Sequence, residues 1–98
     1  MQFLMIARPL EGTPIETILP LIKPEAAKSW EYYAAGQIRS MYYIADMSGA
    51  VFIWEAPSLE AMNELIAQMP MHQTGAFQFE ILPLKPYTGI ESLFASSV

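Results

Sequence analysis

The chain has 98 residues, which is the size of one compact domain. Apolar residues make up 53% of it and charged residues only 15%, a balance that excludes intrinsic disorder. The 5 basic and 10 acidic side chains give a net charge of −5 without any Lys/Arg cluster, which argues against a nucleic-acid partner. The first predicted element is a strand over residues 2–8, a short apolar run that ends at Pro9 and that we expect to be buried on both faces.

A long but broken helix is predicted next. Residues 13–16 (Thr-Pro-Ile-Glu) supply a capping hydroxyl, a proline suited to the first helical position and the carboxylate of a capping box. Pro20 and Pro24 each remove a helical hydrogen bond, so we expect the helix to kink or restart there. Gly36 is a good residue to end it.

Two runs of β-branched and aromatic residues, 38–46 and 50–56, predict a hairpin with a glycine in its turn at residues 47–49. Ser58 then begins a second helix with one apolar stripe, and Pro70 closes that helix. Residues 76–84 alternate between apolar and polar side chains, which suits an edge strand.

The order β-α-β-β-α-β predicts an α+β fold: a ferredoxin-like sandwich with a four-stranded antiparallel sheet and two helices on one face. We treat residues 1–98 as a single domain. Two helices cover one face of such a sheet, yet the strands carry apolar side chains on both faces. We therefore expect a homodimer packed sheet to sheet, with the tail of residues 86–98 lying on the partner subunit. In the alternative, the tail folds back over its own subunit.

Several kinds of site and partner are not expected. The absence of cysteine rules out disulfides, thiolate metal ligands and a cysteine nucleophile. A metal site is not expected, because one histidine without cysteine leaves only carboxylates to complete its ligand set. No glycine-rich loop that could bind phosphate occurs either. The longest apolar run is far too short to cross a membrane, and no basic segment precedes the first one, so we expect a cytoplasmic protein.

A family resemblance covers nearly the whole chain. It is carried by Glu25…Trp30…Tyr33…Gly36-x-x-Arg39-x-x-Tyr42, by residues 49–58, by residues 69–86 and by the closing Leu93-Phe94. This pattern resembles the muconolactone Δ-isomerase-like family of the dimeric α+β barrel superfamily. The resemblance implies a ferredoxin-like protomer, paired sheets, a pocket between sheet and helices, and a reaction that moves a double bond without a cofactor.

Three residues are candidates for that chemistry. Glu25 matches a glutamate of the family and is the proposed base; the alternative is a solvated carboxylate favoured by the helix dipole. Arg39 can hold a substrate carboxylate, such as the one muconolactone carries, or instead form an ion pair with Glu55 or Glu31. Tyr42 is the candidate hydrogen-bond donor, although a regular strand places it on the opposite face from Arg39.

Four further residues are candidate ligand contacts. Trp30, Tyr33 and Trp54 can line a pocket for a flat unsaturated ligand, and ordinary core packing explains their spacing equally well. His72 is the only histidine; it lies in a loop, has no recognisable catalytic partner and does not belong to the family pattern.

The sequence therefore predicts a cofactor-free isomerase that transfers a proton on a small unsaturated acid, lactone or polyketide-like compound. One alternative is a dimer that binds a small ligand without changing it. Others are a cofactor-independent oxygenase or a cyclase of the same superfamily, and an assembly subunit with a filled interior.

Overall fold

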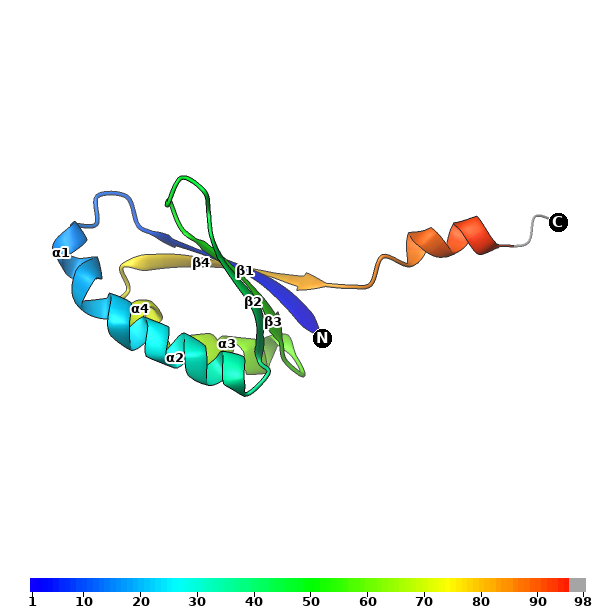
Figure 1. The fold of residues 1–98 in the computed structure, drawn as a ribbon, viewed down its shortest axis with the longest axis horizontal. Coiled ribbons are helices and arrows are strands. Elements are labelled where there is room, and N and C mark those ends of the chain that lie inside the picture. The colour runs from blue at the N-terminus through cyan, green and yellow to red at the C-terminus, as the bar shows by residue number, and fades with distance from the viewer. Residues whose placement is uncertain (96–98) are drawn as a thin grey trace.

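Four strands form one antiparallel sheet in the order β2-β3-β1-β4, and the helices cover one of its faces (Figure 1). The strands of this computed structural model, which describes residues 1–95, are β1 (Gln2–Pro9), β2 (Ile38–Tyr43), β3 (Ala50–Glu55) and β4 (Phe77–Leu84). Both β1 and β3 are central, whereas β2 and β4 are the edges. The element order and topology confirm the predicted ferredoxin-like α+β fold.

The predicted break in the first helix is present. The helical elements are α1 (Ile15–Ile18), the 3₁₀ turn η1 (Leu19–Leu21), α2 (Ile22–Ala34), α3 (Leu59–Ala67), α4 (Pro70–Gln73) and the 3₁₀ segment η2 (Thr88–Phe94). Pro20 lies in η1, where the chain changes direction between α1 and α2. Because Pro24 falls in the first turn of α2, it costs that helix no hydrogen bond.

Two helix boundaries differ from the prediction. Thr13 does not cap α1: its hydroxyl donates to the Leu10 carbonyl at 2.6 Å, and the N-cap position is taken by Pro14. Pro70 was predicted to close the second helix, but α3 already ends at Ala67 and Pro70 begins the short helix α4. Ser58 caps α3 as predicted, and its hydroxyl accepts from the Ala61 N–H at 3.1 Å.

The β2–β3 turn uses its glycine for space and not for backbone freedom. The left-handed residue of this turn is Met47, with φ 63°. Gly49 is needed because a Cβ there would collide with the Ala7 carbonyl oxygen on the neighbouring strand. Gly36 does adopt φ 81° and ends α2 as predicted.

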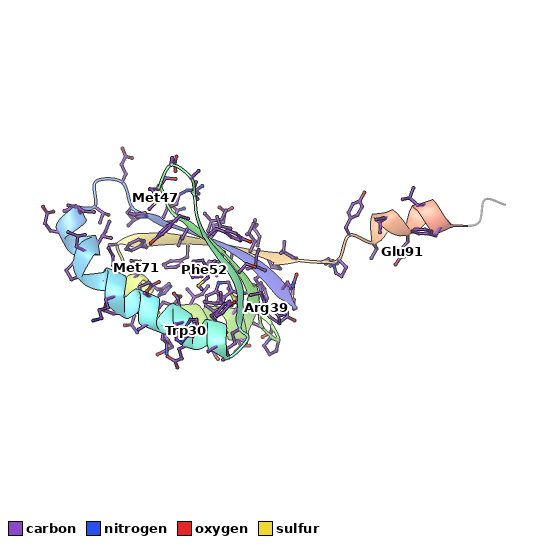
Figure 2. The ribbon with its side chains drawn as sticks, in the orientation of Figure 1. Trp30, Arg39, Met47, Phe52, Met71 and Glu91 are labelled. Carbon is purple, nitrogen blue, oxygen red and sulfur yellow. The ribbon has the colours of Figure 1, made fainter. Side chains whose placement is uncertain are left out.

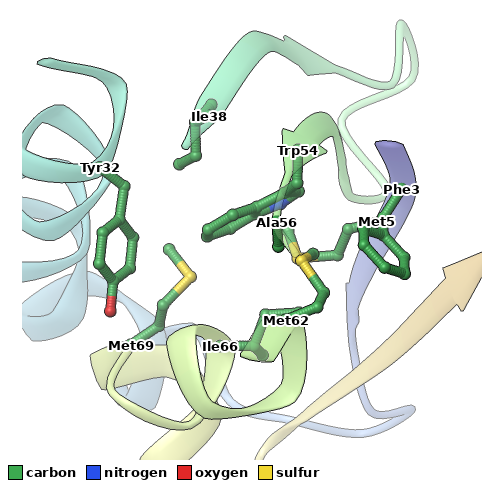
Figure 3. Close-up of a cluster of buried hydrophobic side chains, with 9 residues drawn as sticks. All are labelled: Phe3, Met5, Tyr32, Ile38, Trp54, Ala56, Met62, Ile66 and Met69. Carbon is green, nitrogen blue, oxygen red and sulfur yellow. The ribbon is translucent and has the colours of Figure 1, made fainter. Parts of the chain in front are cut away.

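The core lies between the sheet and helices α2 and α3 (Figure 3). Strand alternation directs Phe3, Met5 and Trp54 toward the helices, where each is at most 1% exposed. The other buried members of this cluster are Tyr32, Ile38, Ala56, Met62, Ile66 and Met69.

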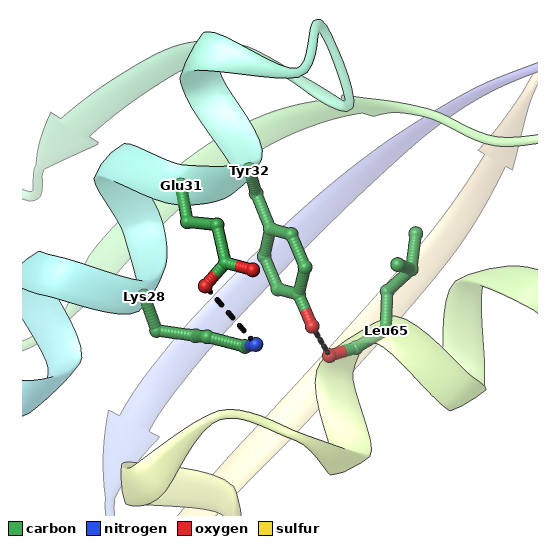
Figure 4. A network of polar contacts seen from close by, with 4 residues as sticks. All are labelled: Lys28, Glu31, Tyr32 and Leu65. Carbon is green, nitrogen blue, oxygen red and sulfur yellow. Dashed lines mark hydrogen bonds and ion pairs between the residues drawn. The ribbon is translucent and has the colours of Figure 1, made fainter.

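A polar contact ties α2 to α3 across this core (Figure 4). The Tyr32 hydroxyl donates to the Leu65 carbonyl at 2.8 Å, and the Lys28 ammonium lies 5.0 Å from the Tyr32 ring centre while it pairs with Glu31 at 3.2 Å. We expect Tyr32→Phe to lower the free energy of unfolding by about 1 kcal/mol, because a carbonyl loses its donor. Urea unfolding measures this loss, and Tyr33→Phe on the exposed side of α2 is the control; equal effects of the two changes would contradict the assignment.

The opposite face of the sheet has no helix over it within residues 1–95 (Figure 1). Its central part is apolar, and the register places Leu4, Ile6, Val51, Ile53 and Leu82 there. We call these five residues the outer face.

The C-terminal tail extends away from the sheet and does not fold back over its own subunit (Figure 1). Tyr87, Leu93 and Phe94 are 81%, 76% and 83% exposed. The predicted tail continues through residues 96–98, which lie outside the described part of the chain.

Candidate functional site

A cavity of about 640 Å³ lies between the inner face of the sheet and the helices. Its walls come from α1, α2, α4, the ends of β1 and β4, and the β2–β3 hairpin, including Met5, Ile18, Ile22, Met41, Phe52 and Phe77. Figure 2 shows Phe52 and Met71 between the sheet and the helices. A volume of this order suits a small organic molecule, and the lining is almost entirely apolar.

Glu25 is the carboxylate in this wall. It lies in the first turn of α2 and is half-buried, and its Oε1 accepts a hydrogen bond from the Met71 N–H at 3.0 Å. Burial raises the pKa of Glu25 above its ordinary value, while the bond from Met71 lowers the pKa by a smaller amount. Ser29, one turn further along α2 and 6% exposed, lies in the same wall.

A bulge in β2 decides which tyrosine faces the cavity. The register shifts between Ile38, which is buried on the inner face, and Ser40. In a regular strand Tyr42 would share the inner face with Ile38, but the extra residue reverses the alternation. Tyr43 is therefore on the inner face, while Tyr42 lies on the outer side of the sheet and contributes to the rim of the cavity.

Sequence reasoning thus missed Tyr43 as a site residue. The two adjacent tyrosines predict one hydroxyl on each face of the strand. Only the position of the bulge shows which of the two tyrosines lies on the inner face. No proline or glycine between residues 38 and 43 signals the bulge in the sequence.

Arg39 lies outside the walls of the cavity. It is at the bulge, near the end of the sheet from which the tail leaves, whereas the cavity wall extends to Met47 and Gly49 in the hairpin turn (Figure 2). Neither predicted ion pair forms: Glu55 pairs with the N-terminal amine at 3.1 Å, and Glu31 pairs with Lys28. The structure therefore does not bring Glu25 and Arg39 of one chain together.

Of the four predicted ligand contacts, the structure places one in the cavity wall and three outside it. Trp30 lies in the cavity wall, and Tyr33 stacks against it at 5.7 Å between ring centres without reaching the wall. Trp54 does not line the cavity as predicted, because its side chain is 0% exposed and packs in the core opposite Phe3. His72 also lies outside the wall, in α4, with its ring 5.2 Å from that of Phe79.

Within residues 1–95, no three His, Asp or Glu side chains gather into a metal-binding group. The helices in this part of the chain are all too short or too polar to span a membrane. The ionisable side chains of the cavity wall are Glu25, Tyr42 and Tyr43. Such a set can accept a proton and hydrogen-bond an oxygen atom.

The stability of the protein should depend on the protonation of Glu25. Because its folded-state pKa is raised, Glu25 favours folding fully below its unfolded pKa near 4.5, and that contribution is lost as the pH rises through the folded pKa. We expect the carboxyl ¹³C signal of Glu25 to titrate with a midpoint above 4.5. Across the same window, the Tm of the native protein should fall relative to that of Glu25→Gln, which cannot titrate. A midpoint at or below 4.5 would contradict the assigned environment.

The sequence matches the family model described as muconolactone delta-isomerase over residues 1–89. This match covers most of the chain, including the strands, the helices α1 to α4 and every wall of the cavity. No curated protein sequence matches the chain.

Two solved structures share the fold. One is a 5-chloro-2-hydroxyhydroquinone dehydrochlorinase from Burkholderia phenoliruptrix in complex with 2,5-dihydroxybenzoquinone, with a TM-score of 0.73 and 19% identity over 87% of this chain and 94% of that one. The other is a muconolactone isomerase, with a TM-score of 0.68 and 21% identity over 89% of this chain and 93% of that one. At these identities the likeness establishes the fold.

Proposed function

The chain belongs to the muconolactone delta-isomerase family, and from this membership we propose that it is a small-molecule enzyme that moves a double bond by proton transfer. The substrate is a small unsaturated acid, lactone or polyketide-like compound, and the reaction needs no cofactor. The observation that carries the proposal is the half-buried Glu25 in the wall of an apolar cavity.

Glu25 is the proposed base. Moving a double bond requires a group that removes a proton from an activated carbon and returns it to another carbon of the same conjugated system. A carboxylate with a raised pKa is suited to both steps, because it binds the proton more firmly than a solvated glutamate and still releases it. The bond from the Met71 N–H holds one carboxylate oxygen and leaves Oε2 as the atom that takes the proton.

The developing enolate oxygen needs a hydrogen-bond donor. Tyr43 is the candidate, because its strand position faces the cavity, and it replaces Tyr42 in this role. Ser29 supplies a second hydroxyl on the same helix face as Glu25. Trp30 contributes an aromatic wall for a flat unsaturated ring.

We also propose that the protein is a homodimer that pairs its outer faces. The five apolar side chains of the outer face lie on adjacent strands and form one patch, which in soluble proteins marks an interaction surface. The exposed tail, with Leu93 and Phe94, supports the same assembly because it presents further apolar surface away from its own subunit.

Hydrogen exchange tests the proposed reaction. The protein is incubated in D₂O with muconolactone and, separately, with its methyl ester, and proton NMR follows the carbons on either side of the migrating double bond. We expect deuterium to enter at these carbons of at least one of the two compounds, together with formation of its isomer. A protein that binds the compounds without any exchange would be a ligand-binding dimer, and oxygen consumption with a hydroquinone would indicate an oxygenase instead.

A further inference from the structure

Charge is distributed unevenly around the cavity. Within residues 1–95 its wall contains one carboxylate, that of Glu25, and no Lys, Arg or His side chain. The other residues of the wall are apolar, apart from the hydroxyl-bearing Ser29, Tyr42 and Tyr43. A ligand that enters this space therefore loses water and meets a potential negative charge without a compensating positive one.

Each of the five cationic side chains of the chain is placed elsewhere. Arg8 pairs in register with Gln78 on the outer side of the sheet, and Arg39 lies at the bulge of β2. Lys28 forms an ion pair with Glu31 and lies over the Tyr32 ring. Lys23 on α2 and Lys85 after β4 are outside the wall as well. Within residues 1–95, no Lys or Arg side chain thus lies in the cavity wall to pair with a ligand carboxylate.

We propose that the cavity selects an uncharged ligand, so that this chain acts on a neutral lactone or polyketide-like ring and rejects carboxylic acids. This inference rests on the proposed function, because it chooses among the substrate classes which that function leaves open. Transfer of an ionised carboxylate to an apolar site without a partner is strongly unfavourable, whereas a neutral carbonyl needs only one hydrogen bond there. The net charge of −5 adds a long-range repulsion of the same sign.

The test uses two probes that differ in one charge. They are the saturated analogue of muconolactone, a γ-lactone with a carboxymethyl arm, and its methyl ester; both lack the double bond and cannot be isomerised. Isothermal titration calorimetry at pH 7.5 measures their dissociation constants for the full-length protein. We expect the ester to bind at least about tenfold more tightly than the acid.

A pair of variants attributes this preference to the cavity. Glu25→Gln removes the wall carboxylate and keeps the size of the side chain. It should therefore strengthen the binding of the acid and bring the dissociation constants of acid and ester closer together, which narrows their ratio. Glu64→Gln removes an exposed carboxylate of α3 outside the cavity wall and should leave the ratio unchanged. An equal narrowing in both variants would assign the preference to overall charge and overturn the proposal.

The remaining outcomes separate this inference from the proposed reaction. Equal or tighter binding of the acid overturns the selection of neutral ligands, and it leaves proton transfer intact if muconolactone exchanges in D₂O. If the ester probe binds more tightly but neither muconolactone nor its methyl ester exchanges hydrogen in D₂O, the proposed reaction is overturned while the selection of neutral ligands is supported. Failure to bind either probe overturns the selection, because the cavity then takes no lactone.

Discussion

Replacing Glu25 by glutamine is expected to lower kcat for double-bond migration by a factor of about 100 to 10,000, the range that a general base contributes. Glutamine has nearly the same shape and can still accept the hydrogen bond from the Met71 N–H, but it cannot take up a proton. The loss should therefore appear in kcat, with KM for a neutral lactone nearly unchanged. Initial rates with muconolactone methyl ester, followed by ultraviolet absorbance, measure both constants.

The kinetic control is Glu64→Gln, which removes the same charge from an exposed position outside the cavity wall. It should retain the rate of the native protein. Equal rates for the native protein and Glu25→Gln would remove Glu25 from the reaction. In that case Tyr43 would be the remaining ionisable group of the inner wall.

A second large effect is expected from Ile53→Lys on β3. Ile53 pairs with Leu4 and belongs to the outer face, so a lysine there would bring an unpaired ammonium group into the proposed contact between two sheets. Multi-angle light scattering should report a dimer or a larger assembly for the native protein and a folded species near 11.0 kDa for the variant. Far-UV circular dichroism checks that the variant is folded.

Asn63→Lys adds the same charge on the exposed side of α3 and should not change the molar mass of the assembly. A native protein that already scatters as a species near 11.0 kDa at micromolar concentration would refute the sheet-to-sheet dimer. The outer face and the tail would then need another explanation.

Much of the fold follows from local patterns. A short apolar run ended by Pro9 identifies β1, and alternating side chains identify β4. The prolines locate the break before α2, and Ser58 marks the start of α3, because each signal acts within a few residues. The capping role of Thr13 was wrong because its hydroxyl donates instead to the Leu10 carbonyl, which lies earlier in the same loop.

The candidate site was less predictable, because it depends on register. Glu25 was identified through the family pattern and a helix position beside the apolar stripe. The exchange of Tyr42 for Tyr43, by contrast, follows from one extra residue in β2 that has no local sequence signal. Arg39 and Trp54 have the chemistry of site residues, but the first lies toward the far end of the sheet and the second completes the core.

The manner in which Glu25 is held separates the anchoring of the carboxylate from the shape of the cavity. Its anchor is a main-chain amide, which every residue except proline provides, while the Met71 side chain forms part of the cavity wall. Position 71 is therefore free to vary in size and shape without releasing the carboxylate. A substitution there would reshape the cavity wall of this chain while the main-chain hydrogen bond to Glu25 stays in place.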